Sequence, residues 1–236
     1  MITVSTLNDF GHQDHGWLKA VHHFSFADYF DPDRMGFGPL RVWNDDQIKG
    51  GTGFPLHPHR DMEIVTYIRK GAVSHEDNLG NQGRTAAGQV QVMSAGTGIR
   101  HSEYNMEDED LDLFQIWVHP NKQGHAPRWD QRDFDRHHAS HGFVTLVSGR
   151  GGQELDGALF IHADAAFKAA ILEDGEETEV SLEDGRLAYV VPARGSIEIN
   201  GVKVPERGSA AISAETLLHI KAKGEVEVVL FDLPSQ

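Results

Sequence analysis

The stretch "HPHRDMEIVTY", residues 57–67, joins two histidines one residue apart to a run of β-branched and aromatic residues. The run "EIVTYI" (63–68) has the composition of a buried β-strand. On an extended strand, side chains at positions i and i+2 face the same side, so His57 and His59 are expected to point together. Pro58 biases His57 away from helix and cannot donate a ladder hydrogen bond, so we expect a strand start or a sheet edge here.

Similar short runs recur along the chain, separated by Gly, Asn and Asp. They lie at 89–93, 113–118, 143–148, 187–191, 196–201 and 226–233. We expect hairpin turns at 78–83 and 199–204, because Gly and Asn tolerate positive φ. Helical periodicity is weak. The regular spacing of short strands therefore predicts an all-β barrel or sandwich.

A faint internal repeat indicates two similar β lobes. The segment "YIRKGAVSH" (67–75) is similar to "YVVPARGSIEI" (189–199), and each precedes a second β-rich run. We expect the lobes to span residues 1–130 and 131–236, joined by a polar segment at 131–142. Where the first copy has "HSE" (101–103), the second keeps only His219, so we expect a C-terminal lobe without metal.

Composition excludes several classes of site. The net charge of −15 disfavours direct binding of nucleic acid. The chain has no cysteine, so a metal must be held by nitrogen and oxygen ligands. The sequence has no run of 18 apolar residues and starts without a basic or apolar leader, so we expect a cytoplasmic protein without a membrane span.

A second histidine pattern lies in "GTGIRHSEYN" (96–105), where His101 and Glu103 are again one residue apart. If this strand lies beside the strand of His57 and His59 and both face the inside of a barrel, three imidazoles and a carboxylate converge. Such a set binds a divalent first-row metal and leaves positions open. Glu63 lies an even number of residues after His59 and is a rival ligand, and Asp61 is a weaker one.

These residues resemble the two motifs of the cupin superfamily. The first motif is matched by Gly51, His57, His59 and Glu63, with Gly71 one residue late, and the second by Gly98, His101 and Asn105 without the usual upstream proline. The resemblance is closer to the pirin family. It covers most of the first 130 residues through the segments at 15–46, 57–67, 93–105 and 115–120.

The resemblance to pirins implies a fold and a metal centre. It implies a bicupin, with two cupin-type β-barrels (double-stranded β-helix, or jelly-roll) in one chain and one metal in the N-terminal lobe. By the resemblance the ligands are His57, His59, His101 and Glu103, and the expected metal is Fe(II), with Mn, Co, Ni, Cu or Zn as alternatives. Glu63 is then expected behind the ligands, orienting a histidine or binding a nearby arginine.

The resemblance also implies an activity. Some pirin-like proteins are quercetinases, which open the heterocyclic ring of a flavonol such as quercetin with O2 and release CO. Glu103 is then expected to act as the general base that accepts the proton of the flavonol hydroxyl. The alternative is a non-enzymatic regulator, in which the metal state alters a surface that binds a transcription factor or a metabolic enzyme. A metal-dependent cupin isomerase is a third hypothesis. We expect a monomer.

Overall fold

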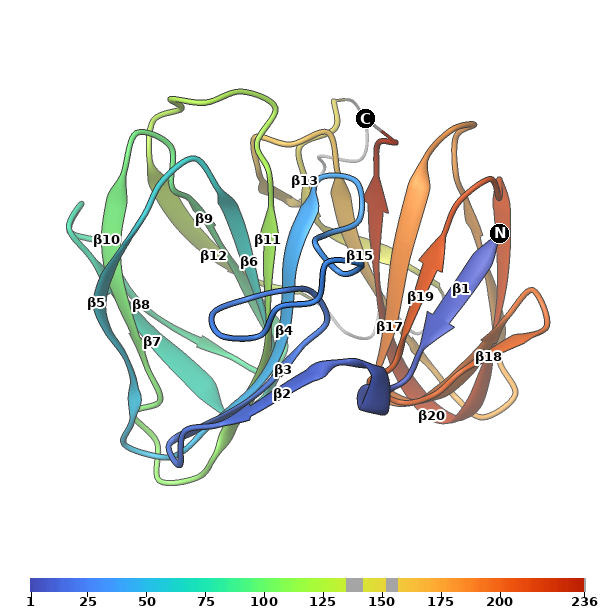
Figure 1. Cartoon of the computed structure of the whole chain (residues 1–236), viewed down its shortest axis with the longest axis horizontal. Coiled ribbons are helices and arrows are strands. Elements are labelled where there is room, and N and C mark those ends of the chain that lie inside the picture. The colour runs from blue at the N-terminus through green and yellow to red at the C-terminus, as the bar shows by residue number, and fades with distance from the viewer. Residues whose placement is uncertain (135–141, 152–156, 236) are drawn as a thin grey trace.

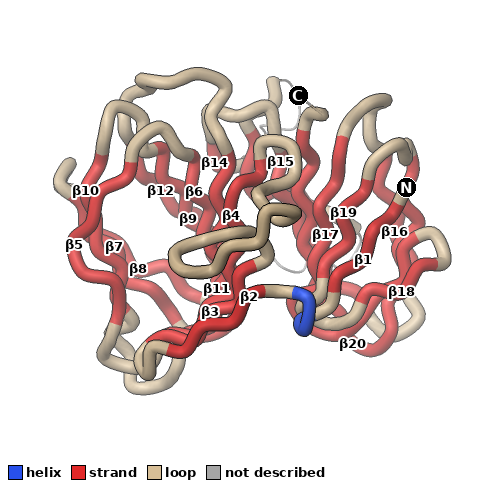
Figure 2. The backbone as a smooth tube through the Cα atoms, in the orientation of Figure 1, coloured by secondary structure: helices blue, strands red, loops and turns tan. Residues whose placement is uncertain are grey.

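The structure is a computed structural model that describes residues 1–134, 142–151 and 157–235. The predicted linker, 131–142, lies largely outside the described residues. Strands dominate the chain (Figures 1 and 2), and helix among the described residues is confined to one 3₁₀ turn, Leu7–Asp9. None of the described segments forms a helix long and apolar enough to cross a membrane. The all-β prediction is confirmed.

Two sheets form the N-terminal barrel within residues 1–134 (Figure 1). The larger sheet has the order β12 (Arg128–Asp133), β9 (Gln89–Ser94), β6 (Glu63–Lys70), β11 (Leu111–Val118), β4 (Leu40–Ile48), β3 (Leu18–His22) and β2 (Gly11–Asp14). The smaller has the order β5 (Gly53–His59), β10 (Ile99–Tyr104), β7 (Ala72–Asp77) and β8 (Gln82–Ala86). The predicted hairpin at 78–83 joins β7 to β8.

The C-terminal lobe is one curved sheet (Figure 1). Its described strands have the order β1 (Ile2–Ser5), β19 (Ser209–Ile212), β17 (Leu187–Ile199), β20 (Leu217–Leu233), β15 (Ala166–Leu172), β13 (Val144–Ser148) and β14 (Leu159–Phe160), with β16 (Glu177–Ser181) on β20 and β18 (Val202–Val204) on β17. The two cupin-type lobes therefore match the predicted fold class. The domain boundary at residues 130 and 131 stays a prediction, and β1 joins the sheet of the C-terminal lobe.

Two separately predicted strands, 187–191 and 196–201, belong to the single strand β17, which ends at Ile199. The pairing of β17 with β20 shifts register on both sides of Arg194. Gly195 lies next to this irregularity with φ +70°, and a Cβ there would lie 2.4 Å from the Glu225 carbonyl oxygen. Only glycine fits without strain, so the break that the sequence shows is a bend within one strand.

The two barrels differ in what fills them. The C-terminal barrel is packed with aliphatic side chains such as Val190, Leu218 and Ile220. His219 points outward between them and pairs with Glu179 on the surface, with Nδ1 2.9 Å from Oε1. The N-terminal barrel instead buries polar side chains around Gln91 and Gln115. Hydrogen-bonding and ligand-binding groups are thus concentrated in the first lobe.

Aromatic packing fixes one lobe against the other. Trp43 and Phe114 of the first lobe pack on Phe167 and Tyr189 of the second, with Trp43 ring centroids 5.4 Å from both Phe114 and Tyr189. Burying a side chain of this size contributes about 1.5–3 kcal/mol. A buried carboxylate, Asp45, also binds one guanidinium from each lobe, Arg69 and Arg207. The lobe that carries the candidate metal ligands is therefore fixed against the second lobe by aromatic packing and by the two ion pairs of Asp45.

Candidate metal centre

Strands β5 and β10 bring three histidines together. They pair antiparallel, and His57 lies directly opposite His101 in the register, with His59 two residues further along β5. The ring centroids lie 4.5 Å apart for His57–His101, 4.8 Å for His57–His59 and 4.9 Å for His59–His101. One ligand atom of each residue lies within 4.8 Å of the other two. The structure therefore brings the three imidazoles together, as expected from strand parity.

The free ring nitrogens of this cluster fit a metal ion. The Nε2 atoms of His59 and His101 are buried and have no hydrogen-bond partner among the described residues. His57 donates from Nδ1 to the Pro55 carbonyl oxygen at 2.7 Å, which leaves its Nε2 lone pair available. Buried polar atoms are seldom left unpaired, because the lost hydrogen bonds to water cost free energy. A divalent first-row metal bound by three imidazole nitrogens accounts for all three atoms.

Burial keeps two of these histidines neutral. It lowers the pKa of His101 to about 3, with the nearby His57 and His75 adding to the effect. It lowers the pKa of His59 to about 4, with His101 and His57 as further causes. Metal ions bind the neutral imidazole, so both rings are ready for a metal at neutral pH.

Glu103 is buried close to His101 and is only 2% exposed. Its ligand atom groups with those of His75 and His101, whereas His57 and His59 are not in that group. Each carboxylate oxygen accepts an amide hydrogen bond, Oε1 from Gln91 at 2.7 Å and Oε2 from Gln115 at 2.8 Å. The carboxylate is therefore held in one orientation next to His101.

The structure does not bring Glu63 to the histidines. The chain turns after His59, where Asp61 has φ +47°, and Glu63 starts β6 in the other sheet. Its Oε2 accepts from Ser94 Oγ at 2.7 Å and from the backbone N–H of His162 at 3.1 Å. Glu63 thus links the first lobe to the second. Asp61 accepts from the backbone N–H of Gly124 at 2.8 Å and takes no part in the cluster.

A second pair of residues lies behind His101. His75 Nδ1 is 3.4 Å from His101 Nδ1, and His75 Nε2 is 3.1 Å from the Asp77 carboxylate. The side chains of His75 and Asp77 have no exposed surface. The residues predicted from the sequence did not include this pair, nor Gln91 and Gln115. The available signal was a polar residue within an apolar strand, as in "LFQIWV", and the i, i+2 pattern of "HED".

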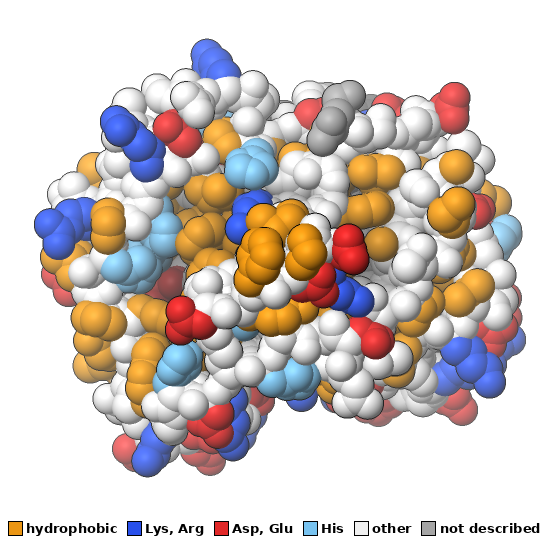
Figure 3. Space-filling model, viewed as in Figure 1, with side chains coloured by type: hydrophobic (Ala, Val, Ile, Leu, Met, Phe, Trp, Pro, Cys, Tyr) orange, Lys and Arg blue, Asp and Glu red, His pale blue; other side chains and the backbone are white. Residues whose placement is uncertain are grey.

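An aromatic wall borders the open side of the cluster. His57 and His59 are partly exposed whereas His101 is buried, so the cluster opens toward His57 and His59. The Trp117 ring meets the His59 ring edge-on at 4.9 Å, and Phe26 meets Trp117 edge-on at 5.3 Å. Figure 3 shows histidine side chains at the surface of this lobe next to apolar ones. The wall offers a flat apolar surface beside the metal-binding atoms.

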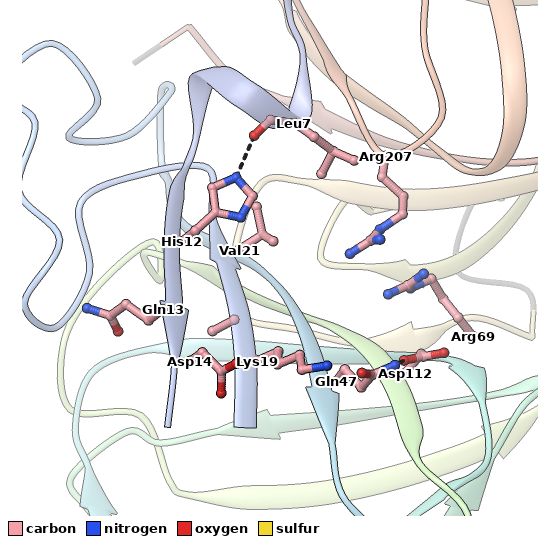
Figure 4. A pocket seen from close by; sticks show the side chains of 11 residues that line it. Leu7, His12, Gln13, Asp14, Lys19, Val21, Gln47, Arg69, Asp112 and Arg207 are labelled. Carbon is pink, nitrogen blue, oxygen red and sulfur yellow. Dashed lines mark hydrogen bonds between the residues drawn. The ribbon is translucent and has the colours of Figure 1, made fainter. Parts of the chain in front are cut away.

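A separate recess of about 500 Å³ lies where the lobes meet (Figure 4). Arg69 and Arg207 point toward one another across it, and Lys19 lines another side. Asp14 and Asp112 also line the recess, and buried Asp45 binds both arginines. These three carboxylates offset the three cations. None of the four predicted ligands lines this recess.

Comparison with known proteins identifies related chains. The family model described as Pirin matches residues 3–118, and the model described as quercetinase C-terminal cupin domain matches residues 135–233. A pirin-like protein of Caulobacter vibrioides is 52% identical over 98% of this chain and 99% of its own. A protein of Escherichia coli K12 named quercetin 2,3-dioxygenase is 45% identical over 99% of both chains.

Solved structures show the same fold at high similarity. The crystal structure of bacterial pirin YhhW from Escherichia coli in complex with nickel(II) superposes with a TM-score of 0.93. That protein is 43% identical, and the match covers 100% of both chains. These relatives are more than 40% identical over nearly the whole chain, and the solved structure has the same fold. The chain therefore belongs to the pirin family, the bicupin branch of the cupin superfamily that its sequence resembles.

Proposed function

We propose that this protein is a metal-dependent dioxygenase that opens the heterocyclic ring of a flavonol such as quercetin with O2 and releases CO. The observation that carries the proposal is the cluster of His57, His59 and His101, which is open toward His57 and His59 and has Glu103 buried close to His101. The full-length similarity to the Escherichia coli protein named quercetin 2,3-dioxygenase supports the same reaction. The proposed ligands are these three histidines and Glu103, and the proposed metal is Fe(II).

The bound metal would polarise the flavonol hydroxyl, lower its pKa and provide the redox-active centre for the reaction with O2. The protein supplies orientation and proton transfer. In this proposal Glu103 accepts the hydroxyl proton at one carboxylate oxygen. That oxygen must first exchange an amide hydrogen bond, from Gln91 or Gln115, for the substrate proton. The remaining amide bond keeps the carboxylate in place during the transfer.

The aromatic wall gives a reason for a planar substrate. A flavonol that reaches the metal-binding atoms past His57 and His59 would lie against Trp117, with Phe26 behind it. Contacts between aromatic rings contribute about 0.5–1.5 kcal/mol beyond the area they bury. The same wall excludes water from one side of the ring that reacts. Trp117 is therefore proposed as the residue that orients the substrate.

The test is aerobic incubation of quercetin with Fe(II)-loaded protein, following flavonol absorbance, CO and the ring-opened ester product. We expect steady loss of quercetin with one CO per substrate, and no turnover for Glu103→Ala. Quercetin that stays intact while metal analysis shows a loaded protein would refute the proposal. That outcome, together with a specific protein partner recovered by pull-down, would favour the regulatory alternative.

A further inference from the structure

His75 is a buried histidine of the N-terminal barrel for which the proposed reaction has no role. It lies on β7, opposite Glu103 in the pairing of β7 with β10. Its ring stacks on Trp129, with centroids 4.8 Å apart and planes at 10°, and lies 5.2 Å from the His101 ring. Its ligand atom groups with those of His101 and Glu103, so its position alone is compatible with a fourth metal ligand. However, both of its ring nitrogens already have hydrogen-bond partners.

Asp77 determines which nitrogen of His75 carries the proton. Its Oδ1 accepts the backbone N–H groups of Leu79 at 2.9 Å and Asn81 at 3.1 Å, and its Oδ2 accepts Asn81 Nδ2 at 2.9 Å. Backbone N–H groups only donate, so this carboxylate acts as an acceptor throughout. His75 Nε2, 3.1 Å from Oδ2, is therefore the donor of that pair. A neutral His75 then has its lone pair on Nδ1.

The lone pair on His75 Nδ1 in turn determines the tautomer of His101. The two Nδ1 atoms are 3.4 Å apart, a long hydrogen bond that needs one donor and one acceptor. Since His75 Nδ1 accepts, His101 Nδ1 must carry the proton. The lone pair of His101 then lies on Nε2, the buried atom without a partner among the described residues. Both nitrogens of His75 are used, so it has none left for a metal.

We propose that His75 is a positioning residue that, together with Asp77, holds His101 in the Nδ1–H tautomer with Nε2 directed at the metal. The inference rests on the metal centre of the proposed function and assigns a role to a residue outside the ligand set. Hydrogen bonds to the second nitrogen of a ligating imidazole fix its tautomer and ring orientation, and losing them costs about 10–100-fold in metal affinity. The second nitrogen of a ligating histidine usually donates to a carboxylate, a backbone carbonyl or water. In the chain Asp77–His75–His101 the acceptor of the His101 proton is instead the imidazole of His75.

The tautomers are tested first in the metal-free protein. Two-bond ¹H–¹⁵N correlations of histidine-labelled protein near pH 7.5 show which ring nitrogen carries the proton. We expect His101 protonated at Nδ1 and His75 protonated at Nε2. The opposite tautomer at either residue would overturn the inference, whether or not the protein binds metal.

The second test compares Ni²⁺ affinity, measured by competition with a chromophoric chelator, for two variants of His75. His75→Phe keeps a ring against Trp129 and removes the acceptor, so we expect affinity to fall about 10–100-fold. His75→Asn places an amide oxygen near the former Nδ1, so we expect it to recover part of that loss. His219→Phe, the same substitution on the surface of the other lobe, should bind as the unaltered protein does.

Equal affinities of His75→Phe and the unaltered protein would overturn the positioning role. So would an equal loss in His75→Phe and His75→Asn, because that result would show that ring packing matters and the acceptor does not. Failure of the unaltered protein to bind Ni²⁺, Fe²⁺ or other first-row metals would instead refute the proposed function. The tautomers of the metal-free protein would still report on the hydrogen-bond chain.

Discussion

Replacing Gln115 with glutamate tests its buried contact with Glu103. Gln115 is 9% exposed and donates to Glu103 Oε2 at 2.8 Å. In Gln115→Glu two carboxyl groups face one another in a buried site, and they can remain together only by sharing a proton. Gln115→Met is the matched control, because it keeps the volume and removes the donor without adding a charge.

The two variants differ in how their stability depends on pH. Gln115→Met loses a hydrogen bond to a carboxylate, and we expect a loss of about 1.5–3 kcal/mol that changes little with pH. In Gln115→Glu the folded protein keeps a proton that the unfolded chain releases above about pH 4.3. Its stability relative to the unaltered protein then falls by about 1.4 kcal/mol for each pH unit above that value. At pH 7 the loss reaches about 3.5–4 kcal/mol, a large part of the stability of a typical domain.

The assay is urea unfolding of metal-free protein at pH 5, 6, 7 and 8. Each variant is compared with the unaltered protein at the same pH, so titration of other groups cancels. At pH 5 the shared proton costs little and Gln115→Glu should be the more stable variant, whereas at pH 8 Gln115→Met should be. A difference between Gln115→Glu and the unaltered protein that stays constant from pH 5 to pH 8 would refute the buried contact with Glu103.

Three further predictions concern other parts of the molecule. The metal-free protein should lose stability as pH falls from 6.5 toward 4, by up to about 1.4 kcal/mol per pH unit for each of His59 and His101. The reason is that these histidines bind a proton in the unfolded chain but stay neutral in the folded protein. A stability in urea unfolding that does not change over this pH range would contradict the prediction. Asp45→Asn should lower the free energy of unfolding by about 3–5 kcal/mol in the same assay, because it removes the buried negative charge that pairs with Arg69 and Arg207. Asp14→Asn should lower it little. Trp117→Ala should raise KM for quercetin about three- to tenfold, from the loss of about 0.5–1.5 kcal/mol of ring contact, and Trp117→Phe should restore most of it; unchanged KM in steady-state assays would exclude the proposed wall.

Local patterns in the sequence predicted strands such as β6, β9 and β11 and the cluster of three histidines, whereas β4 and β15 were not predicted. Strand parity placed His57 beside His59, and two similar segments indicated that His101 would join them. This works because a strand's side chains alternate regardless of distant contacts. The same parity count failed to locate Glu63. The count runs from His59 to Glu63 across the turn at Asp61, where the chain passes from one sheet to the other. Residues before and after this turn therefore do not lie on the same face of one strand.

Contacts between strands distant in sequence were not predictable in this way. Gln91 and Gln115 hold Glu103 from β9 and β11. Locally, Gln115 looks like a lone polar residue among apolar ones, and Gln91 looks like the polar position of an alternating strand. His75 has its role only because β7 pairs with β10. Which polar residues face the inside of a barrel depends on the order of strands in the sheets. A single sequence does not encode that order in any short pattern.

The pairing of β1 with β19 has a consequence for how the molecule folds. Val4 lies opposite Ala210, so partners more than two hundred residues apart must meet before that edge is complete. During synthesis β1 leaves the ribosome about two hundred residues before β19, so it has no strand partner over that interval. Contacts of such long range slow folding, because the loop they close must be ordered before they contribute. Joining this edge is therefore expected among the last events in folding, after the first barrel has already formed.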